Sequence, residues 1–394
     1  MTVTSSGDHV FGRVRPSHDG DFQLNGKTVR VTTFRDLPPP TGVAPYRLDL
    51  RDIIPASDYE EIVTTKKLVF HFNGDVGGID FATPQQLVAA GMESDCSVPG
   101  QAAPRFLYLV GDCVYFNGET ARYYAQFYQP YEHYPLPIFA VPGNHDGENL
   151  EGQSSLDGFV RNFCAPTPGI HQPEAQDAPR TAMTQPNVYW TLLTPLVNIV
   201  GLYSNVPDGG EITSPQTEWL VGELRSLPAD VPIIVTLHHP VYSADTYHSG
   251  SPAMKTFLEN AAEAAGRHPD LVVAGHVHDY QRLTKVMTDG SQIPYLVTGA
   301  GGYHNLHTIL KVNGQRLIAP VQFTDKGGDV VTLESYVDDR FGFLRFEVSE
   351  SSFTGRYFTV PRPQESFSKG SQLTDLFEYD WKAKRYIPNA LSAS

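Results

Sequence analysis

The sequence is poor in cysteine and has no long apolar run. Its three cysteines, Cys96, Cys113 and Cys164, show no CxxC spacing and cannot all pair with one another. They are therefore expected to be reduced thiols in or near the core, not a zinc site. No stretch approaches the roughly 18 apolar residues of a membrane span. The N-terminus has neither the basic start nor the apolar segment of a secretory signal. Unless a signal has been removed, these features predict a cytoplasmic protein without a transmembrane segment.

Basic residues are also scarce. Lys and Arg number 29 against 44 Asp and Glu, a formal net charge of −15, and no Lys/Arg run forms a local basic patch. Such a chain would be repelled by nucleic-acid backbones and anionic membranes, so no nucleic-acid partner is expected. What is present is 394 residues, 40% of them hydrophobic, with 34 Gly and 31 Pro. This composition fits a large, loop-rich globular protein. The 14 His are the first indication of metal chemistry.

Short apolar runs alternate with helical segments along the middle of the chain. Buried strands are expected at 68–73, 105–110, 137–141, 188–193, 196–203, 233–237, 271–274 and 295–298. Helices are expected at 119–128, 214–227 and 252–265, the second capped by Ser214. Residues 165–186, rich in Pro, Gln, Ala and Asp, read as a long surface loop. Strand signals also occur at 28–33 and after residue 329, with a hairpin over 343–358. The alternation predicts an α/β fold.

Polar residues follow five of these strands where the strands end. The segments are Gly74-Asp75-Val76-Gly77, Gly111-Asp112-Cys113-Val114-Tyr115, Gly143-Asn144-His145-Asp146, Leu237-His238-His239-Pro240 and Gly275-His276-Val277-His278. A Gly-Asp pair alone is often only a turn, but in an open α/β sheet this edge is where ligands bind. Carboxylate and phenolate oxygens suit a hard cation, whereas imidazole and an amide oxygen suit a borderline divalent ion. Since a carboxylate can bridge two metals, these residue types are consistent with a dinuclear site.

These segments resemble the calcineurin-like metallophosphoesterase superfamily and, more closely, the purple acid phosphatases. The superfamily opens with Asp-x-His, whereas this chain has Asp75-Val76-Gly77. Purple acid phosphatases have Gly there and supply a Tyr from a GDxxY segment, which Tyr115 matches. The segments at 238–248, 275–282 and 298–302 are similar too. The resemblance covers roughly 67–360 and implies a four-layer α/β/β/α sandwich of two mixed sheets as the catalytic domain. Residues 1–66 would form an N-terminal strand-bearing extension and 361–394 a tail that packs on the core.

The resemblance also implies a role for each matching residue. The first metal, by analogy Fe(III), would be held by Asp75, Asp112, Tyr115 and His278. The second metal, Fe, Zn or Mn, would share Asp112 and be completed by Asn144, His238 and His276. A water whose pKa the metals lower would be the nucleophile that attacks phosphorus. A structural role in packing remains an alternative for Tyr115.

Two further histidines are candidates for catalysis. His145 directly follows a metal-ligand candidate and can contact the phosphate or protonate the leaving group, and His248 is the other candidate acid. Candidate substrate contacts, beside Asn144 and His145, are His239 and His304. His239 is equally consistent with a structural role. Asp245, Asp279, His304 and His307 either line the pocket or belong to plain loop surface.

The implied activity is metal-dependent hydrolysis of a small-molecule phosphoric ester, most simply by an acid-phosphatase-like phosphomonoesterase. A phosphodiesterase that acts on a small diester, such as a cyclic nucleotide, a phospholipid headgroup or a nucleotide conjugate, is the first alternative. A non-catalytic, metal-stabilised binding scaffold is the second.

Overall fold

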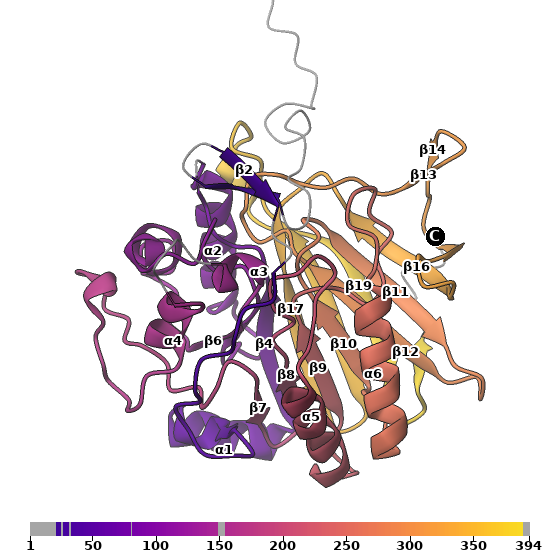
Figure 1. The fold of residues 1–394 in the computed structure, drawn as a ribbon, viewed down its shortest axis with the longest axis horizontal. Coiled ribbons are helices and arrows are strands. Elements are labelled where there is room, and N and C mark those ends of the chain that lie inside the picture. The colour runs from indigo at the N-terminus through magenta and orange to yellow at the C-terminus, as the bar shows by residue number, and fades with distance from the viewer. Residues whose placement is uncertain (1–20, 25–26, 31–32, 80, 149–153, 389–394) are drawn as a thin grey trace, which may run out of the picture.

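Two large mixed β-sheets form the centre of the protein (Figure 1). The computed structural model describes residues 21–24, 27–30, 33–79, 81–148 and 154–388. The seven-stranded sheet contains, in spatial order, β20 (Arg385–Ile387), β19 (Gln372–Asp380), β18 (Ser352–Thr359), β17 (Gly342–Ser349), β4 (Lys67–Asn73), β5 (Leu107–Val110) and β6 (Ile138–Val141). The nine-stranded sheet contains β15 (Val321–Thr324), β16 (Val330–Val337), β11 (Tyr280–Val286), β12 (Gln292–Thr298), β10 (Leu271–Ala274), β9 (Ile233–Leu237), β8 (Asn198–Gly201), β7 (Trp190–Leu193) and β3 (Arg47–Asp49).

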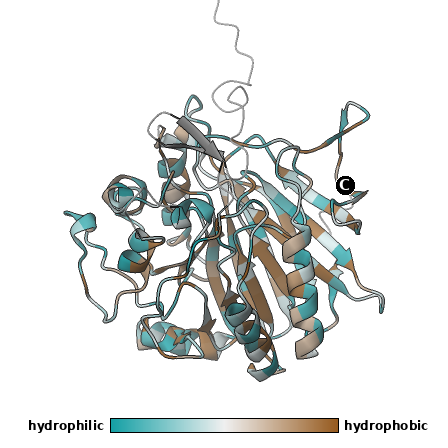
Figure 2. Cartoon of the chain, viewed as in Figure 1, coloured by the Kyte–Doolittle hydropathy of each residue, from teal (hydrophilic) through white to brown (hydrophobic). Residues whose placement is uncertain are grey.

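The two sheets pack face to face, and their central strands are buried on both faces. On β5, Tyr108 and Val110 point into the core between the sheets, whereas Leu107 and Leu109 point into the outer core of the seven-stranded sheet. This is the two-residue alternation of a strand, here with apolar residues on both sides. It explains why the sequence shows these strands as continuous apolar runs. In Figure 2 the central strands are accordingly coloured as hydrophobic.

Helices cover the outer faces of both sheets. α2 (Thr83–Asp95) and α4 (Asp157–Phe163) pack on the seven-stranded sheet through Met92 and Phe163, among others. α5 (Ser214–Ser226) and α6 (Pro252–Ala265) pack on the nine-stranded sheet through residues such as Leu220 and Leu258. The predicted α/β fold with four layers is therefore confirmed. The division at residues 66 and 360 stays a prediction, although β3 joins the nine-stranded sheet and β19 and β20 join the seven-stranded one.

Two local predictions about helices were wrong. Thr213, not Ser214, caps α5, because its side chain accepts a hydrogen bond from the N–H of Gln216. The segment 119–128 is not a regular α-helix but a 3-10 turn, Thr120–Arg122, followed by a π-helical turn, Tyr124–Tyr128. There the buried amide of Gln126 bonds to both the N–H and the C=O of Tyr115. Such tertiary contacts outweigh the local helix propensity.

The remaining segments surround this framework. β1 (Asp21–Leu24) and β2 (Lys27–Arg30) form a hairpin, and residues 31–32 of the strand expected at 28–33 lie outside the described residues. α1 (Ala56–Thr65) precedes β4, and β13 (Lys311–Val312) pairs with β14 (Gln315–Arg316). The loop at 165–186 is anchored to the fold, since the buried amide of Gln185 bonds to the N–H and C=O of Ala140.

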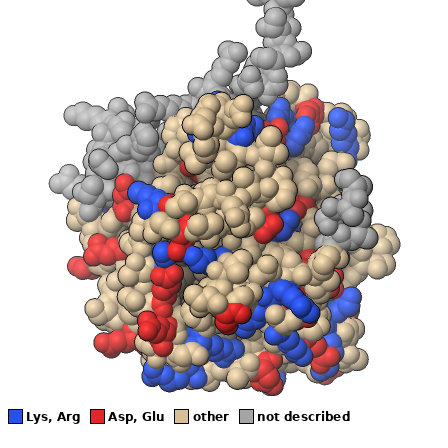
Figure 3. Space-filling view, turned by 90° about the vertical axis from the view of Figure 1, so that its right-hand side faces the viewer, with Lys and Arg blue, Asp and Glu red and all other residues tan. Residues whose placement is uncertain are grey.

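The cysteines and the surface agree with the composition. Cys113 and Cys164 are buried, Cys96 is half-buried and all three are free, as predicted. None of the described helices has the length and the apolar character that a membrane crossing requires. On the face in Figure 3, Lys and Arg side chains lie among Asp and Glu and do not gather into one basic stripe.

Candidate metal centre

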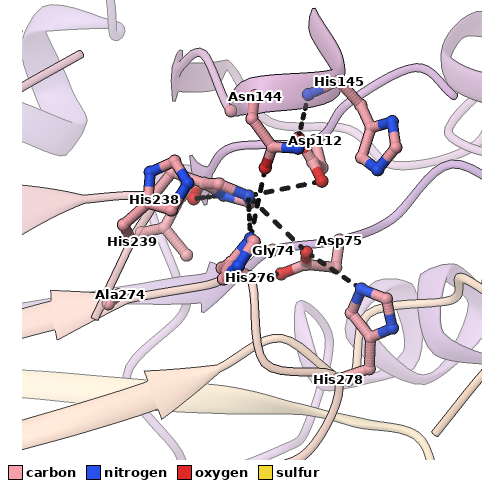
Figure 4. A network of polar contacts seen from close by, with 12 residues as sticks. Gly74, Asp75, Asp112, Asn144, His145, His238, His239, Ala274, His276 and His278 are labelled. Atoms are coloured by element: carbon pink, nitrogen blue, oxygen red, sulfur yellow. Dashed lines mark hydrogen bonds and ion pairs between the residues drawn. The ribbon is translucent and has the colours of Figure 1, made fainter. Parts of the chain in front are cut away.

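The five polar strand ends meet at one edge of the molecule. β4, β5 and β6 are parallel neighbours in one sheet, and β9 and β10 are parallel neighbours in the other. Because parallel strands end at the same edge, the loops after them lie side by side (Figure 4). All of the predicted ligands are at least nine-tenths buried: Asp75, Asp112, Tyr115, Asn144, His238, His276 and His278.

Three of these residues form a first cluster of donor atoms. The Tyr115 hydroxyl donates a hydrogen bond to Asp75 Oδ1 at 3.2 Å and lies 3.4 Å from His278 Nε2. His278 Nε2 is 3.5 Å from the same Asp75 oxygen. The three atoms thus form a nearly equilateral triangle.

Four residues form a second cluster next to it. Asp112 Oδ2 lies 3.3 Å from His238 Nε2, which lies 3.3 Å from His276 Nδ1. His276 Nδ1 is in turn 3.2 Å from Asn144 Oδ1. The two clusters adjoin, since His238 Nε2 is 4.0 Å from Asp75 Oδ1. Carboxylate oxygens of Asp75 and Asp112 and a ring nitrogen of His238 all fall within 4.8 Å of one another.

These separations fit metal ligation. Donor atoms bound at about 2.1 Å to one ion are about 3.0–3.4 Å apart in octahedral or tetrahedral geometry. The opposite ring nitrogens are also held, because His238 Nδ1 lies 2.9 Å from the carbonyl of Val110 and His278 Nδ1 lies 2.8 Å from that of Asn305. An N–H at Nδ1 that donates to a carbonyl leaves the Nε2 lone pair for a metal. Both clusters therefore suit a cation by donor type and spacing.

The charges in the site also call for a cation. Burial lowers the pKa of His238, but the negative charges of Asp112 and Asp75 outweigh this and raise it to about 10. Burial, together with the charges of Asp112 and Asp75, holds the pKa of Tyr115 well above its usual range. Two buried carboxylates thus create a strongly negative site, in which a phenolate forms only beside added positive charge.

The backbone of the site is held in uncommon conformations. Asp75, Asp112 and His276 have φ angles of 56°, 52° and 68°. Non-glycine residues rarely adopt this left-handed region, and such residues concentrate at functional sites. The loop approach is also tight, since a Cβ on Gly143 would lie 2.1 Å from Asp112 Oδ1. Gly143 must therefore lack a side chain for these loops to pack.

Asp146 is a site residue to which the sequence assigned no role. Its carboxylate accepts hydrogen bonds from the backbone N–H groups of Cys113, Val114 and Gly143. Burial and the charge of Asp112 raise its pKa to about 7. The available signal was its position three residues after Gly143, from which its carboxylate reaches back to the N–H of Gly143 at the start of a short helix, α3 (Asn144–Gly147).

The candidate catalytic histidines flank the clusters on different sides. The backbone N–H of His145 donates to Asp112 Oδ1 at 3.0 Å, and its ring lies 4.5 Å from that of Tyr115. The ring of His248 lies 4.7 Å from that of His276. Among the candidate substrate contacts, His239 also packs on the ring of His276, at 4.5 Å, and its Nδ1 lies 2.8 Å from Ser204 Oγ.

The other candidate pocket residues contact these rings or lie buried near them. His304 packs its ring on that of Tyr303, with 4.7 Å between centroids. Asp245, Asp279 and His307 are buried, so the alternative that they are plain loop surface was wrong. His307 Nδ1 lies 3.3 Å from Asp245 Oδ2, and the same oxygen accepts a hydrogen bond from the N–H of His248.

A cavity of about 480 Å³ adjoins the second cluster. Its lining includes His239, Tyr247, His248, His276 and Lys326. A larger cavity, of about 880 Å³, lies at the opposite ends of β9 and β10, beside Pro232 and Asp270. Of these two cavities, the smaller one lies at the site, because its lining includes the proposed ligand His276, whereas the larger one is lined by none of the proposed ligands.

Sequence comparison matches the chain to one family model and to plant relatives. Residues 74–280 match the family model of the calcineurin-like phosphoesterases. Purple acid phosphatase 21 of Arabidopsis thaliana is 31% identical over 172 residues, which cover 42% of this chain and 36% of that protein. The matched part of the chain thus spans little more than a third of that relative's length.

Two solved structures share the fold. A purple acid phosphatase from yellow lupin (Lupinus luteus) seeds has a TM-score of 0.56 at 15% identity, with 94% of this chain and 61% of that chain covered. The anchor in the inner membrane complex of Plasmodium has a TM-score of 0.52 at 14% identity, with 82% of this chain and 90% of that chain covered.

Proposed function

The chain belongs to the calcineurin-like phosphoesterase family, and from this premise we propose that it hydrolyses phosphoric monoesters at a dinuclear metal centre, in the manner of an acid phosphatase. The observation that carries the proposal is the convergence of two adjoining donor clusters at the edge where the strands of both sheets end. The similarity to a plant purple acid phosphatase supports the choice of a monoester substrate.

Each cluster is proposed to hold one ion. Asp75, Tyr115 and His278 form the first subsite, whose phenolate and carboxylate oxygens suit Fe(III). Asn144, His238 and His276 form the second, whose amide oxygen and imidazoles suit Fe, Zn or Mn. Asp112 is the proposed bridge, because one of its oxygens lies 3.3 Å from His238 Nε2 of the second subsite and, together with burial, its charge raises the pKa of Tyr115 in the first.

The protein's own residues supply binding and proton transfer. Bound metal ions supply Lewis acidity and a water-derived nucleophile near neutral pH. His145, beside the first cluster, is the proposed contact for a phosphate oxygen. His248, which lines the cavity, is the proposed general acid, because a leaving group that extends into the cavity would present its oxygen there.

The test is the release of phosphate from p-nitrophenyl phosphate by the full chain loaded with Fe, Zn or Mn. Phosphate release that disappears in Asp112→Ala supports the proposal. Bound metal without turnover at any pH would favour the non-catalytic scaffold. The scaffold is considered because one protein of the same fold is described as an anchor.

A phosphodiesterase is the second candidate, and the cavity of about 480 Å³ favours it. A diester carries a second organic group, which needs room beside the metals, and the cavity adjoins the second cluster through His276. Assays of p-nitrophenyl phosphate and bis(p-nitrophenyl) phosphate on the same preparation separate the two. A higher kcat/KM for the diester would overturn the monoesterase proposal and leave the family assignment intact.

A further inference from the structure

A small aromatic cluster, separate from the three large hydrophobic cores, lies against the first metal subsite. It consists of Ile79, Tyr115 and Tyr303, with Phe116 packed beside it. Tyr303 is 4% exposed and follows the Gly-rich segment at 298–302. Neither the sequence nor the proposed reaction assigns a role to Tyr303.

Tyr303 contacts all three residues of the first cluster. Its ring stacks on the Tyr115 ring, with 4.0 Å between centroids and 19° between planes. It meets the His278 ring edge-on at 4.9 Å. Its backbone N–H donates a 2.9 Å hydrogen bond to the carbonyl of Asp75. Tyr303 thus contacts the ring of Tyr115, the ring of His278 and the backbone of Asp75.

The loop before Tyr303 leaves it little freedom. The N–H of Gly301 donates to the carbonyl of Gly74 at 3.1 Å, and a Cβ on Gly301 would lie 2.2 Å from that oxygen. The glycine therefore permits a close approach of this loop to the loop that carries Asp75. This approach seats Tyr303 against the first cluster.

The second cluster is packed by other rings. His239 and His248 lie against His276, at 4.5 and 4.7 Å between centroids. The two subsites, although adjoining, thus have different supporting shells. Supporting residues of this kind typically change metal affinity by about 10- to 100-fold when they are removed.

We propose that Tyr303 is a positioning residue for the first subsite, and that loss of its ring weakens the binding of one of the two metal ions and leaves the other bound. This inference rests on the proposed dinuclear centre. The proposal assigns the effect to the ring, because the ring of Tyr303 makes the contacts with Tyr115 and His278.

The test compares the full-length wild type with Tyr303→Phe, Tyr303→Leu and Tyr379→Leu, and with Asn144→Ala alone and combined with Tyr303→Leu. Tyr379 is the matched control, because it is also a buried tyrosine stacked on another ring, that of Phe353 in the seven-stranded sheet. Each protein is checked for folding by circular dichroism, stripped with a chelator and titrated with Zn²⁺ by calorimetry. Metal content is then measured by mass spectrometry.

The wild type, Tyr303→Phe and Tyr379→Leu should each bind two ions. Tyr303→Leu should bind one ion with unchanged affinity and the other about 10- to 100-fold more weakly. Asn144→Ala, which alters the second cluster, should retain one ion, and Tyr303→Leu combined with Asn144→Ala should retain none tightly. If Tyr303→Leu does not fold, Tyr303→Met takes its place with the same expectation.

Three results would overturn the inference: two ions of unchanged affinity in Tyr303→Leu, an equal loss of both ions, or one tightly held ion in the double variant. An equal loss of metal affinity in Tyr379→Leu would also overturn it, because the loss in Tyr303→Leu would then reflect general destabilisation. A wild type that binds no metal overturns the proposed function itself, and this result is distinct from all of these.

Discussion

The carboxylate of Asp146 receives two hydrogen bonds, of 3.0 and 3.1 Å, from the backbone N–H of Cys113. It also accepts from Val114 at 3.1 Å and from Gly143 at 2.9 Å. One side chain thereby ties the loop that carries Asp112 to the loop that carries Asn144. The bridging candidate and a ligand of the second subsite are held together from behind.

Replacing Asp146 with Ala should therefore destabilise the protein and weaken metal binding. Three buried N–H groups would lose their acceptor, which should lower the free energy of unfolding by about 3 kcal/mol. Asp146→Asn keeps one acceptor oxygen and should lose less. Urea unfolding measures the change, with Asp157→Ala, an exposed acid on α4, as the control. A loss in Asp146→Ala no larger than in Asp157→Ala would contradict this role.

The positions of the proposed ligands could be predicted because the signal is local. An apolar run predicts a buried strand, the polar residues that follow mark its end, and parallel strands bring their ends to one edge. This reasoning placed Asp75, Asp112, Asn144, His238 and His276 together, and the structure brings their donor atoms within a few ångströms of one another.

The supporting residues could not be predicted, because their partners are distant in sequence. Tyr303 stacks on Tyr115, and Gln126 bonds to the backbone of that tyrosine through a π-helical turn. A single sequence carries no local sign of either contact. The same holds for Asp245 and His307, whose interpretation as surface or pocket depended on burial that only the three-dimensional arrangement decides.

The proposed acid, His248, can be tested by the leaving group. p-Nitrophenolate departs without a proton, whereas an alkoxide needs one. His248→Asn should therefore lower kcat by less than about tenfold for p-nitrophenyl phosphate, but by about 100-fold or more for glycerol phosphate. Steady-state kinetics on both substrates measure the two ratios.

His145→Asn is the matched comparison. As a phosphate contact, His145 should affect both substrates by a similar factor, because the phosphoryl group is the same. The kinetics of each variant are compared with those of the wild type on the same two substrates. If His145→Asn shows the larger dependence on the leaving group, the two roles must be exchanged.

The carboxylate of Asp329 should contribute to the free energy of unfolding in a pH-dependent way. Burial raises its pKa, but hydrogen bonds from Lys255, Lys285 and Tyr242 outweigh this and lower it to about 2. A carboxyl group with a lowered pKa in the folded state stabilises the protein above the unfolded value near 4, and this contribution is lost as pH falls toward 2. Because water screens partly exposed charges, the contribution should be about 1 kcal/mol.

Asp329→Asn should thus lower the free energy of unfolding at pH 7 and converge with the wild type near pH 2. Urea unfolding across this range measures the difference, with the exposed Asp36→Asn as the control. A difference that persists unchanged at pH 2 would show that shape, not charge, stabilises the contacts of Asp329 with α6 and β11.

Removal of metal should destabilise the folded protein as well as abolish activity. The buried carboxylates of Asp75 and Asp112 would then face each other with only histidines to compensate their charge. A ligand that binds the folded state alone, at 100 times its Kd, adds about 2.7 kcal/mol to the free energy of unfolding. A chelator should therefore lower the melting temperature, and added Zn²⁺ or Mn²⁺ should restore it.

In Asp112→Asn, which weakens both proposed subsites, the chelator should have little further effect, whereas Asp157→Asn should respond like the wild type. A chelator effect of full size in Asp112→Asn would place the stabilising ion elsewhere in the protein.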